Sequence, residues 1–265
     1  MTTRLSQTEV YEFWNRQAHE HGQSPSASWS DHRVIEMEIA EISKHLSDGD
    51  CVLDVGCANG YSSLQFACAR LVQLRGIDYV PKMIDEARAR LRAVKEDVRS
   101  SVEFDVGDIT QLREPSNAYN KVVVVRVLIN LGTWERQLKG LHECVRVLQS
   151  GGLLLLSEAT LQGWRRLNAL RKEWGLEEIP MPPFNQYVDQ DQVVSAIGSE
   201  AELVEISNFA STYYVGTRVL KPLLAKATRA PVSIVDPNAE WNRWFSQFPP
   251  AGDYGTQKLF VFRKL

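Results

Sequence analysis

The sequence predicts an α/β fold, a doubly wound and mostly parallel sheet of seven strands with helices on both faces. Apolar, β-branched segments alternate with amphipathic segments of helical period from residue 31 to about residue 160, and strands separated by helices form parallel sheets. The apolar segment 51–56 also opens through Gly56 and Gly60 into a helical pattern. A strand that turns through glycines into a helix offers the free N–H groups of the helix N-terminus to a ligand.

The composition is that of a soluble globular protein. Of the 265 residues, 44% are apolar and 24% charged, and the formal net charge is −3, which gives no reason to expect a nucleic acid or an anionic membrane as partner. No apolar run reaches the roughly 20 residues that span a bilayer. Met1–Gln7 has no apolar signal core, and the four cysteines show no CxxC pairing, so we expect a cytoplasmic protein without a metal site.

The first half of the chain gives three strands with a helix before each of the first two and after the second. Asp31 is typical of a helix N-cap, and apolar residues at helical spacing follow it. Pro81 suits the first turn of the helix after the second strand. The expected elements are a helix after Asp31, a strand at 51–56, a helix through Leu64 to Leu71, a strand at 73–78, a helix from Pro81 through Leu91 and a strand at 102–106.

The second half begins with the most apolar strand, 121–128, which we expect at the centre of the sheet. A helix at 134–148 should end at Ser150-Gly151-Gly152, because glycine stops helices. The stretch between the last two strands is too long for a hairpin loop, so 211–255 is expected to be a helical insertion. The remaining elements are a strand at 153–157, a helix at 161–175, a proline-rich loop at 179–187, a helix at 189–199, and strands at 202–209 and 258–263.

The glycine turn reads Asp54-Val-Gly56-Cys-Ala58-Asn-Gly60, with the spacing Asp-x-Gly-x-Ala-x-Gly. It resembles the first motif of the class I S-adenosylmethionine-dependent methyltransferases, Asp/Glu-x-Gly-x-Gly-x-Gly, with Ala58 in place of the middle glycine. The resemblance extends downstream to Asp78 after the second strand, Asp108 after the third and the glycine pair before the fifth. It implies a Rossmann-like fold and S-adenosyl-L-methionine as cofactor, with S-adenosyl-L-homocysteine as product.

The resemblance also implies a role for each matching residue. Backbone of the glycine turn would meet the amino-acid tail of the cofactor, and Asp78 would accept both ribose hydroxyls. Asp108 would accept the adenine amine, with the Ile109 N–H beside it. Tyr79 and Met83 would pack on the adenine or the ribose. The residues expected at the cofactor are Asp54, Gly56, Cys57, Ala58, Asn59, Gly60, Asp78, Tyr79, Met83, Gly107, Asp108, Ile109, Arg126, Tyr11, Trp14 and Arg33.

Several of these residues have an alternative structural interpretation. Asp54 can bond loop amides instead of the cofactor. Tyr79 and Met83 can be ordinary core residues. Arg126 is unusual in an apolar strand, and such a charge is either paired with an acid or lines a pocket.

The reaction implied is an in-line displacement, in which an oxygen or nitrogen of a small molecule takes the methyl group from the sulfonium. A hydroxyl acceptor needs a general base nearby, whereas an amine needs only its neutral form. The sequence does not identify the acceptor. The candidate catalytic residues are Glu158, His32 and Tyr214.

The resemblance also implies a domain organisation. Residues 1–30 carry Tyr11, Phe13, Trp14 and Trp29 and are interpreted as a helical lid, or equally as a helix that packs on the sheet. Residues 31–265 form the methyltransferase domain, with 161–200 and 211–255 as cap insertions on the substrate side. An aromatic stripe within 241–248 has helical spacing and indicates core or dimer contact, so the protein is expected to be a monomer or a homodimer.

Parts of the sequence also bear on three other functions. Pro182-Pro183-Phe184 resembles a motif of nucleic-acid amino-methylating enzymes, but it lies after the fifth strand rather than the fourth, so we interpret it as a loop. An NAD-dependent oxidoreductase would show Gly-x-Gly-x-x-Gly. A non-catalytic cofactor-binding subunit of the same fold stays open. The pattern as a whole resembles bacterial methyltransferases of natural-product or surface-sugar biosynthesis.

Overall fold

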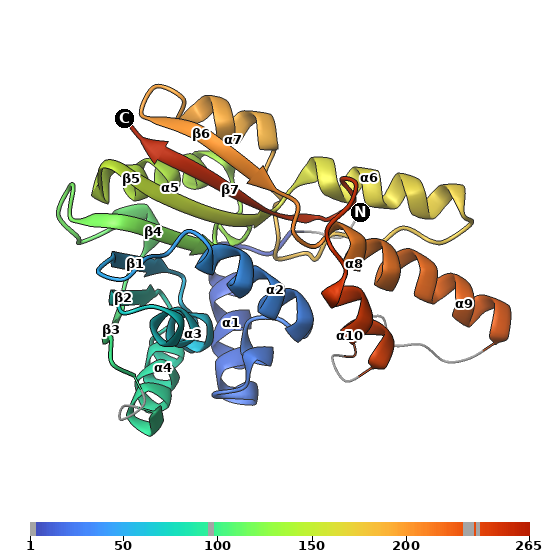
Figure 1. Cartoon of the computed structure of the whole chain (residues 1–265), viewed down its shortest axis with the longest axis horizontal. Helices are drawn as coiled ribbons and strands as arrows, with labels where there is room; N and C mark the ends of the chain where they lie inside the picture. Colours follow the sequence, from blue (N-terminus) through green and yellow to red (C-terminus); the bar gives the residue numbers. More distant parts are fainter. Residues whose placement is uncertain (1–3, 95–97, 230–235, 237–238) are drawn as a thin grey trace.

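A seven-stranded sheet forms the centre of the computed structural model, which describes residues 4–94, 98–229, 236 and 239–265. The strand order is β3-β2-β1-β4-β5-β7-β6 (Figure 1). The first five strands are parallel, and β7 runs antiparallel between β5 and β6. The predicted doubly wound, mostly parallel sheet is therefore confirmed. The strands are β1 (Cys51–Val55), β2 (Gln73–Asp78), β3 (Ser101–Val106), β4 (Tyr119–Val125), β5 (Leu148–Ala159), β6 (Ala201–Ser207) and β7 (Gln257–Lys264).

Several helices begin at residues whose side chains cap them. The Asp31 side chain accepts a hydrogen bond from the Val34 N–H, as its N-cap position predicts. Ser6 and Glu9 form a capping box at the start of the first helix. The helices are α1 (Gln7–His21), α2 (His32–Ser43), α3 (Tyr61–Ala69), α4 (Pro81–Val94), α5 (Trp134–Val147), α6 (Leu161–Glu173), α7 (Gln190–Ala196), α8 (Ser211–Val215), α9 (Lys221–Thr228) and α10 (Glu240–Gln247). None of the helices within the described ranges is long and apolar enough to cross a membrane.

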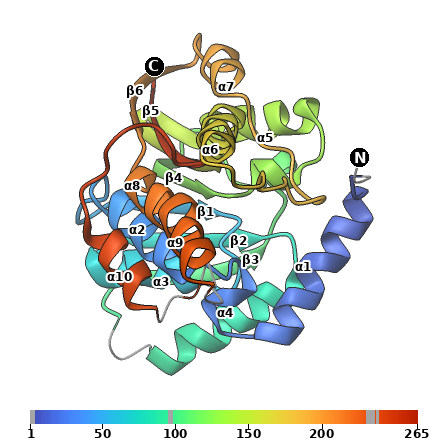
Figure 2. The same cartoon turned by 90° about the vertical axis from the view of Figure 1, so that its right-hand side faces the viewer.

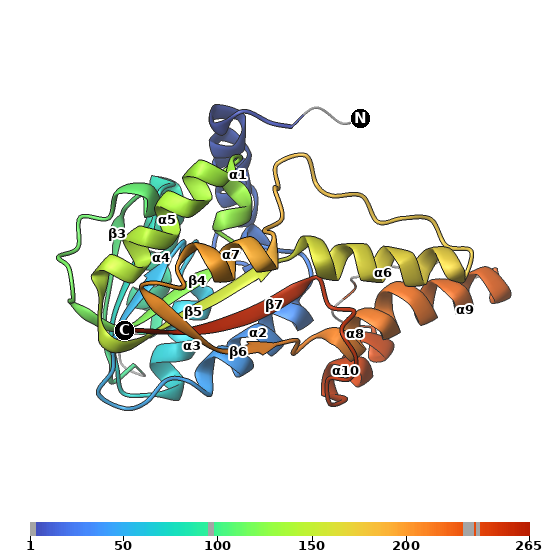
Figure 3. The same cartoon turned by 90° about the horizontal axis from the view of Figure 1, so that it is seen from above.

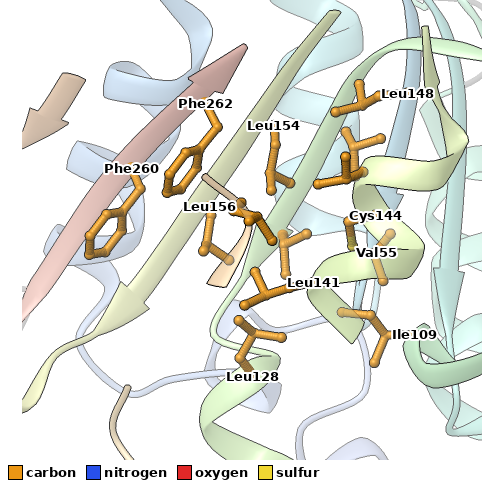
Figure 4. Packing of buried hydrophobic residues seen from close by; sticks show 14 of the residues in the cluster. Val55, Ile109, Leu128, Leu141, Cys144, Leu148, Leu154, Leu156, Phe260 and Phe262 are labelled. Atoms are coloured by element: carbon orange, nitrogen blue, oxygen red, sulfur yellow. The ribbon is translucent and has the colours of Figure 1, made fainter. Parts of the chain in front are cut away.

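The central strands are apolar on both faces, and successive residues alternate between two cores. Leu154 and Leu156 of β5 pack with Phe260 and Phe262 of β7 against α5 and α7 (Figure 4). Leu155 points to the other face, where α2 and α3 lie. Figure 3 shows these two helical layers on opposite sides of the sheet.

Several predicted boundaries were wrong: the strand predicted at 153–157 spans Leu148–Ala159, and two further differences have a reason in backbone geometry. The predicted strand 121–128 ends at Val125, because Arg126 adopts a left-handed conformation with φ of 56°. The predicted helix 134–148 ends at Val147 without using the glycine pair. Gly151 and Gly152 lie inside β5, next to a register shift against β4. A side chain at Gly152 would meet the carbonyl oxygens of Gln149 and Asn120 at 2.9 and 3.0 Å, so the glycine there serves the strand.

The helices after β6 gather beyond one end of the sheet, beside α6 (Figures 1 and 3). They comprise α8, a π-helical turn at Gly216–Leu220, α9 and α10, as the helical insertion 211–255 predicts, although 230–235 and 237–238 lie outside the described residues. Figure 2 shows α1 on the opposite side of the molecule from α10. The sheet end between these helices is where the parallel strands finish, and there the pocket opens.

Candidate functional site

A cavity of about 460 Å³ lies at the carboxyl ends of the parallel strands. Its walls include the turns after β1, β2, β3 and β4, and the last residue of β5. Chain order reverses between β1 and β4, and a crevice at such a reversal is where doubly wound sheets bind ligands. The sequence thus places its first motif at the centre of the cavity.

Neighbouring residues pack tightly against the turn after β1. Gly56 has φ of 76°, and a Cβ there would lie 2.2 Å from Val127 Cγ2, so only glycine fits. The backbone N–H groups of Gly56 and Cys57 donate to the Ile77 carbonyl at 2.7 and 2.9 Å. Gly60 faces Phe104 and Ala87 rather than the cavity. The turn is therefore rigid before a ligand binds.

Asp78 ends β2 as a buried carboxylate at the cavity wall. Its two oxygens accept hydrogen bonds from the Ala58 N–H at 3.0 Å and the Val80 N–H at 2.9 Å. Burial raises the pKa of Asp78 to about 6, and these two hydrogen bonds oppose the shift. A partner that hydrogen-bonds or neutralises the carboxylate would offset its desolvation.

Asp54 and Asp108 add two more carboxylates to the wall. Asp54 is buried and accepts a 2.5 Å hydrogen bond from Ser63 Oγ, while burial raises its pKa to about 7. Asp108 accepts from the Thr110 N–H and Oγ1, both at 2.8 Å. Asp54 thus holds α3 through the Ser63 hydroxyl rather than through loop amides, and it also lines the cavity, where its contact with a cofactor stays a prediction. Three acids at the ends of β1, β2 and β3 suit a cation that also carries hydroxyl and amine donors, which are the groups of S-adenosylmethionine.

The first helix and the loop at 179–187 close the cavity together. Trp14 Nε1 donates to Asn130 Oδ1 at 3.3 Å, and Asn185 Nδ2 donates to the same oxygen at 3.1 Å. The Phe13 ring stacks on Phe184 with 4.4 Å between centroids. Asn130, just after β4, therefore joins α1 to the loop.

Arg126 marks the side of the cavity that faces β5 and β7. Its left-handed backbone is held by a hydrogen bond from its N–H to the Ser157 carbonyl at 2.8 Å. The guanidinium lies 4.9 Å from the Trp29 ring centroid, and its Nε is 3.5 Å from Glu38 Oε2. Arg126 is at once paired with an acid and part of the wall, and backbone strain of this kind concentrates at functional sites.

The structure brings most of the expected cofactor residues to the cavity. Tyr79, Met83, Gly107 and Ile109 line it with the three acids, and so do Cys57, Ala58, Asn59, Arg126 and Trp14. Three expected residues are not part of the wall. These are Gly60, Tyr11, whose ring packs edge-on against Tyr79 at 5.7 Å, and Arg33, which pairs with Glu36 at 2.7 Å.

Of the three catalytic candidates, only Tyr214 lines the cavity. The expectation that Glu158 faces the cavity was wrong. Its buried carboxylate accepts hydrogen bonds from the Val127 and Leu128 N–H groups at 2.8 and 2.7 Å, and so orders the loop after β4. His32 lies behind the wall, with Nε2 2.7 Å from Ser26 Oγ.

Sequence reasoning missed part of the wall. The omitted residues near Tyr214 come from segments far apart in the chain, and they are Trp29, Ala159, Tyr187, Thr256 and Gln257. The proline-rich loop was correctly interpreted as a loop, but its Phe184 and Asn185 also line the cavity. The one signal in the sequence that could have indicated these residues was the excess of aromatic residues in the N-terminal segment and in the proline-rich loop.

Sequence comparison gives a family and several relatives. A family model described as a methyltransferase domain matches residues 52–152. The 27-O-demethylrifamycin SV methyltransferase of Amycolatopsis mediterranei is 34% identical over 116 residues, which are 44% of this chain and 41% of that protein. Ajmaline N-methyltransferase of Rauvolfia serpentina is 27% identical over 194 residues, 72% of this chain and 55% of that protein. The chain thus spans about half the length of these relatives.

Solved structures share the fold. Magnesium protoporphyrin IX methyltransferase of Synechocystis with bound S-adenosylhomocysteine has a TM-score of 0.61 at 16% identity, and the match covers 98% of this chain and 100% of that one. The [4+2]-cyclase SpnF has a TM-score of 0.56 at 20% identity, covering 86% and 81%. Because a cyclase stands among these neighbours, the fold alone does not fix the reaction.

Proposed function

We propose that the chain, whose residues 52–152 match a methyltransferase domain, is a class I S-adenosylmethionine-dependent methyltransferase and transfers the methyl group of this cofactor to an oxygen or nitrogen of a small molecule. The observation that carries the proposal is the convergence of Asp54, Asp78 and Asp108 on one cavity beside the glycine turn. The bound cofactor supplies an electrophilic methyl group on a positively charged sulfur and leaves as S-adenosylhomocysteine.

The residues of the chain would hold the cofactor by charge and hydrogen bonding. Asp78 is the candidate for the ribose hydroxyls, since a buried carboxylate at the end of β2 can accept two donors. Asp108 and the Ile109 N–H are the candidates for the adenine. The rigid turn at Gly56–Asn59 would meet the amino-acid tail. Preformed groups of this kind lose little freedom on binding.

The lid and the loop at 179–187 would exclude water and align the acceptor. Alignment and water exclusion are the main contributions an enzyme can make to a displacement whose leaving group is already good. We propose residues 1–30 as the lid of a methyltransferase domain at 31–265, with 161–200 and 211–255 as its cap. Phe13, Trp14 and Phe184 already meet across the cavity mouth.

The acceptor is proposed to be a small molecule rather than a nucleic acid or a membrane component. The net charge of −3 and the named substrates of the relatives support this. A place in bacterial secondary-metabolite or sugar biosynthesis, a cytoplasmic location and a monomeric or homodimeric state complete the proposal. Tyr214 is the retained candidate for contact with the acceptor. Burial raises its pKa, so it would act as a neutral hydrogen-bond donor.

The test is methyl transfer from labelled S-adenosylmethionine to a panel of phenols, carboxylic acids, amines and sugars. We expect labelled product and an equal amount of S-adenosylhomocysteine with at least one class. Tight binding of the cofactor without turnover on any class would favour the non-catalytic subunit. Binding of NAD in preference to either sulfur compound would favour the oxidoreductase.

A further inference from the structure

The cavity has two chemically different sides, and the sheet order separates them. The acids lie at the ends of β1, β2 and β3, whereas the opposite side is formed at the ends of β4 and β5 and the start of β7. Thr256 and Gln257 reach this second side because Gln257 pairs with Ala159 at the end of β5. The cofactor groups assigned above occupy the first side, so the second is left for the acceptor.

The second side is largely aromatic and carries the Arg126 guanidinium, while Arg136 of α5 is a further cation in the cavity wall. Trp29, Tyr187 and Tyr214 line it, and Arg126 lies against the Trp29 ring. Burial raises the pKa of Tyr187 as well as that of Tyr214, so both phenols stay neutral. A flat, apolar body fits between such rings. The charge of this side is then decided by Arg126 and its neighbours.

The Arg126 guanidinium is incompletely satisfied. Its Nε and Nη1 are buried and have no hydrogen-bond partner among the described residues. Glu38 Oε2, which also lacks a hydrogen-bond partner among these residues, lies 3.5 Å from Nε in a loose ion pair, whereas Glu38 Oε1 accepts from Ser157 Oγ at 2.5 Å and Gln257 Nε2 at 2.9 Å. Nη1 is therefore the buried donor that Glu38 leaves for a ligand. Buried donors without acceptors are rare in folded proteins, because each one loses its hydrogen bonds to water.

Glu38 does not cancel the role of Arg126. It is absent from the cavity wall, whereas Arg126 belongs to it. Glu38 therefore contacts the guanidinium from outside the cavity, and burial raises its pKa although Arg126 opposes that rise. A guanidinium presents five donors and binds a carboxylate through two of them. Arg126 therefore has donors to offer to a ligand on the aromatic side.

We infer that the acceptor is an aromatic or conjugated anion, whose carboxylate-like oxygens pair with Arg126 while its apolar body lies against Trp29, Tyr187 and Tyr214. The inference rests on the proposed function, because it assigns the cofactor to the acidic side. A carboxylate is also present in the tail of the cofactor, but the turn expected to meet that tail follows β1. Trp29, Glu38 and Gln257 surround Arg126 on the β7 side.

The experiment compares an acid with its neutral amide of the same shape. Benzoate and benzamide, and 2-naphthoate and 2-naphthamide, are titrated into the full chain saturated with S-adenosylhomocysteine. We expect each acid to bind at least about ten-fold more tightly than its amide. In Arg126→Gln the preference should disappear, and in Arg126→Lys, which keeps the charge, part of it should remain. Arg165→Gln, which removes an exposed arginine of α6, should keep the full preference.

The outcomes distinguish a failure of the inference about the acceptor from a failure of the proposed function. Equal binding of acid and amide by the wild-type chain, or binding of neither, overturns the inference, whether or not a variant folds. If Arg126→Gln instead weakens S-adenosylhomocysteine and the acids show no preference, Arg126 serves the cofactor carboxylate and the inference is also wrong. Failure of the wild-type chain to bind S-adenosylhomocysteine at all would contradict the proposed function itself.

Discussion

Two buried acids, Asp54 and Asp78, face the cavity. Their ionisation destabilises the folded state, because burial removes water from the charged carboxylates. Burial raises the pKa of Asp54 to about 7 and that of Asp78 to about 6. An acid whose pKa is raised by folding destabilises the folded state as pH rises from its unfolded pKa, near 3.9, through its folded value. Above about pH 7 both carboxylates are ionised, and the destabilisation of the folded state reaches its full value. A cationic ligand offsets that cost, because it favours the ionised forms.

S-Adenosylmethionine binding should therefore be linked to proton release. We expect protons to leave the protein on binding at pH 6.5, and affinity to increase between pH 5.5 and pH 8. Calorimetry in two buffers of different ionisation enthalpy measures the number of protons. Asp54→Asn removes one of the two groups and should release fewer. Binding that is independent of pH and of buffer would contradict this assignment of the charges.

At the residue scale, the sequence predicts the acids well and the catalytic candidates poorly. Asp78 and Asp108 follow strand ends in fixed positions, so a local motif finds them. Glu158 is adjacent to Ala159, which does line the cavity. One residue along a strand reverses the direction of the side chain. Because β5 is apolar on both faces, no alternation in the sequence tells which of the two residues faces the ligand.

At the scale of elements, α1 is held over the cavity by few polar contacts. Trp14 Nε1 donates to Asn130 Oδ1 at 3.3 Å, and Gln7 Nε2 reaches the Asn130 carbonyl at 3.4 Å. One hydrogen bond of this kind contributes about 0.5–1.5 kcal/mol. Loss of these polar contacts would leave the sheet behind α1 intact, as the proposed role of α1 as a lid requires.

Trp14→Phe keeps an aromatic ring but removes that hydrogen bond. We expect S-adenosylhomocysteine to dissociate about 2- to 10-fold faster from this variant, as measured by stopped-flow displacement. Glu12→Gln, an exposed change on the same helix, should leave the dissociation rate unchanged. Equal rates for Trp14→Phe and the wild type would show that α1 packs on the molecule without acting as a lid.

The existence and order of the elements were predictable, while some of their ends were not. Runs of β-branched residues identify β4, but the strand stops at Arg126 because this residue turns left-handed. A glycine in a sequence can indicate a left-handed backbone, whereas an arginine does not. In β5, Gly152 is needed for close approach of the neighbouring strand, and Gly151 adopts a left-handed backbone. A glycine after a helix pattern has the same appearance in a sequence whether it ends the helix or serves the next strand.

At the scale of the whole molecule, a buried ion pair joins the helical insertion to α2. The Arg218 guanidinium contacts Asp31, and both residues are buried. Tyr213 Oη donates to Asp31 at 2.9 Å, and Asn242 Nδ2 donates to Tyr213 at 3.0 Å. The Arg218 guanidinium also stacks 4.5 Å from the ring centroid of Tyr214 in the cavity wall. The pair thus fixes the aromatic side of the cavity to the sheet.

Breaking this pair should destabilise the entire chain. Arg218→Met leaves the Asp31 carboxylate buried without its cation, and we expect a loss of about 3–5 kcal/mol in the free energy of unfolding. Urea denaturation checks the value. Glu36→Gln, which breaks an exposed pair with Arg33, should leave the unfolding midpoint unchanged within error. A loss for Arg218→Met as small as that of the control would contradict the structural role of the pair.

This long-range arrangement could not be predicted from the sequence. Asp31 and Arg218 are 187 residues apart, and no local sequence pattern around either residue indicates that the two are paired. The sequence predicted that 211–255 would be helical and would cover the substrate side, but not which helix would supply Tyr214 to the cavity. The same holds for Trp29, Tyr187 and Gln257, whose positions depend on how separate segments pack.

The central claim is that the cavity beside the glycine turn binds S-adenosylmethionine through Asp78. Calorimetric titration of the full chain with S-adenosylmethionine and S-adenosylhomocysteine tests it most directly, alongside Asp78→Asn and the control Asp85→Asn, an exposed acid of α4. We predict one-to-one binding of both compounds, weakened at least about ten-fold by Asp78→Asn and unchanged by Asp85→Asn. No binding of either compound at millimolar concentration, or equal affinity in all three proteins, would contradict the claim.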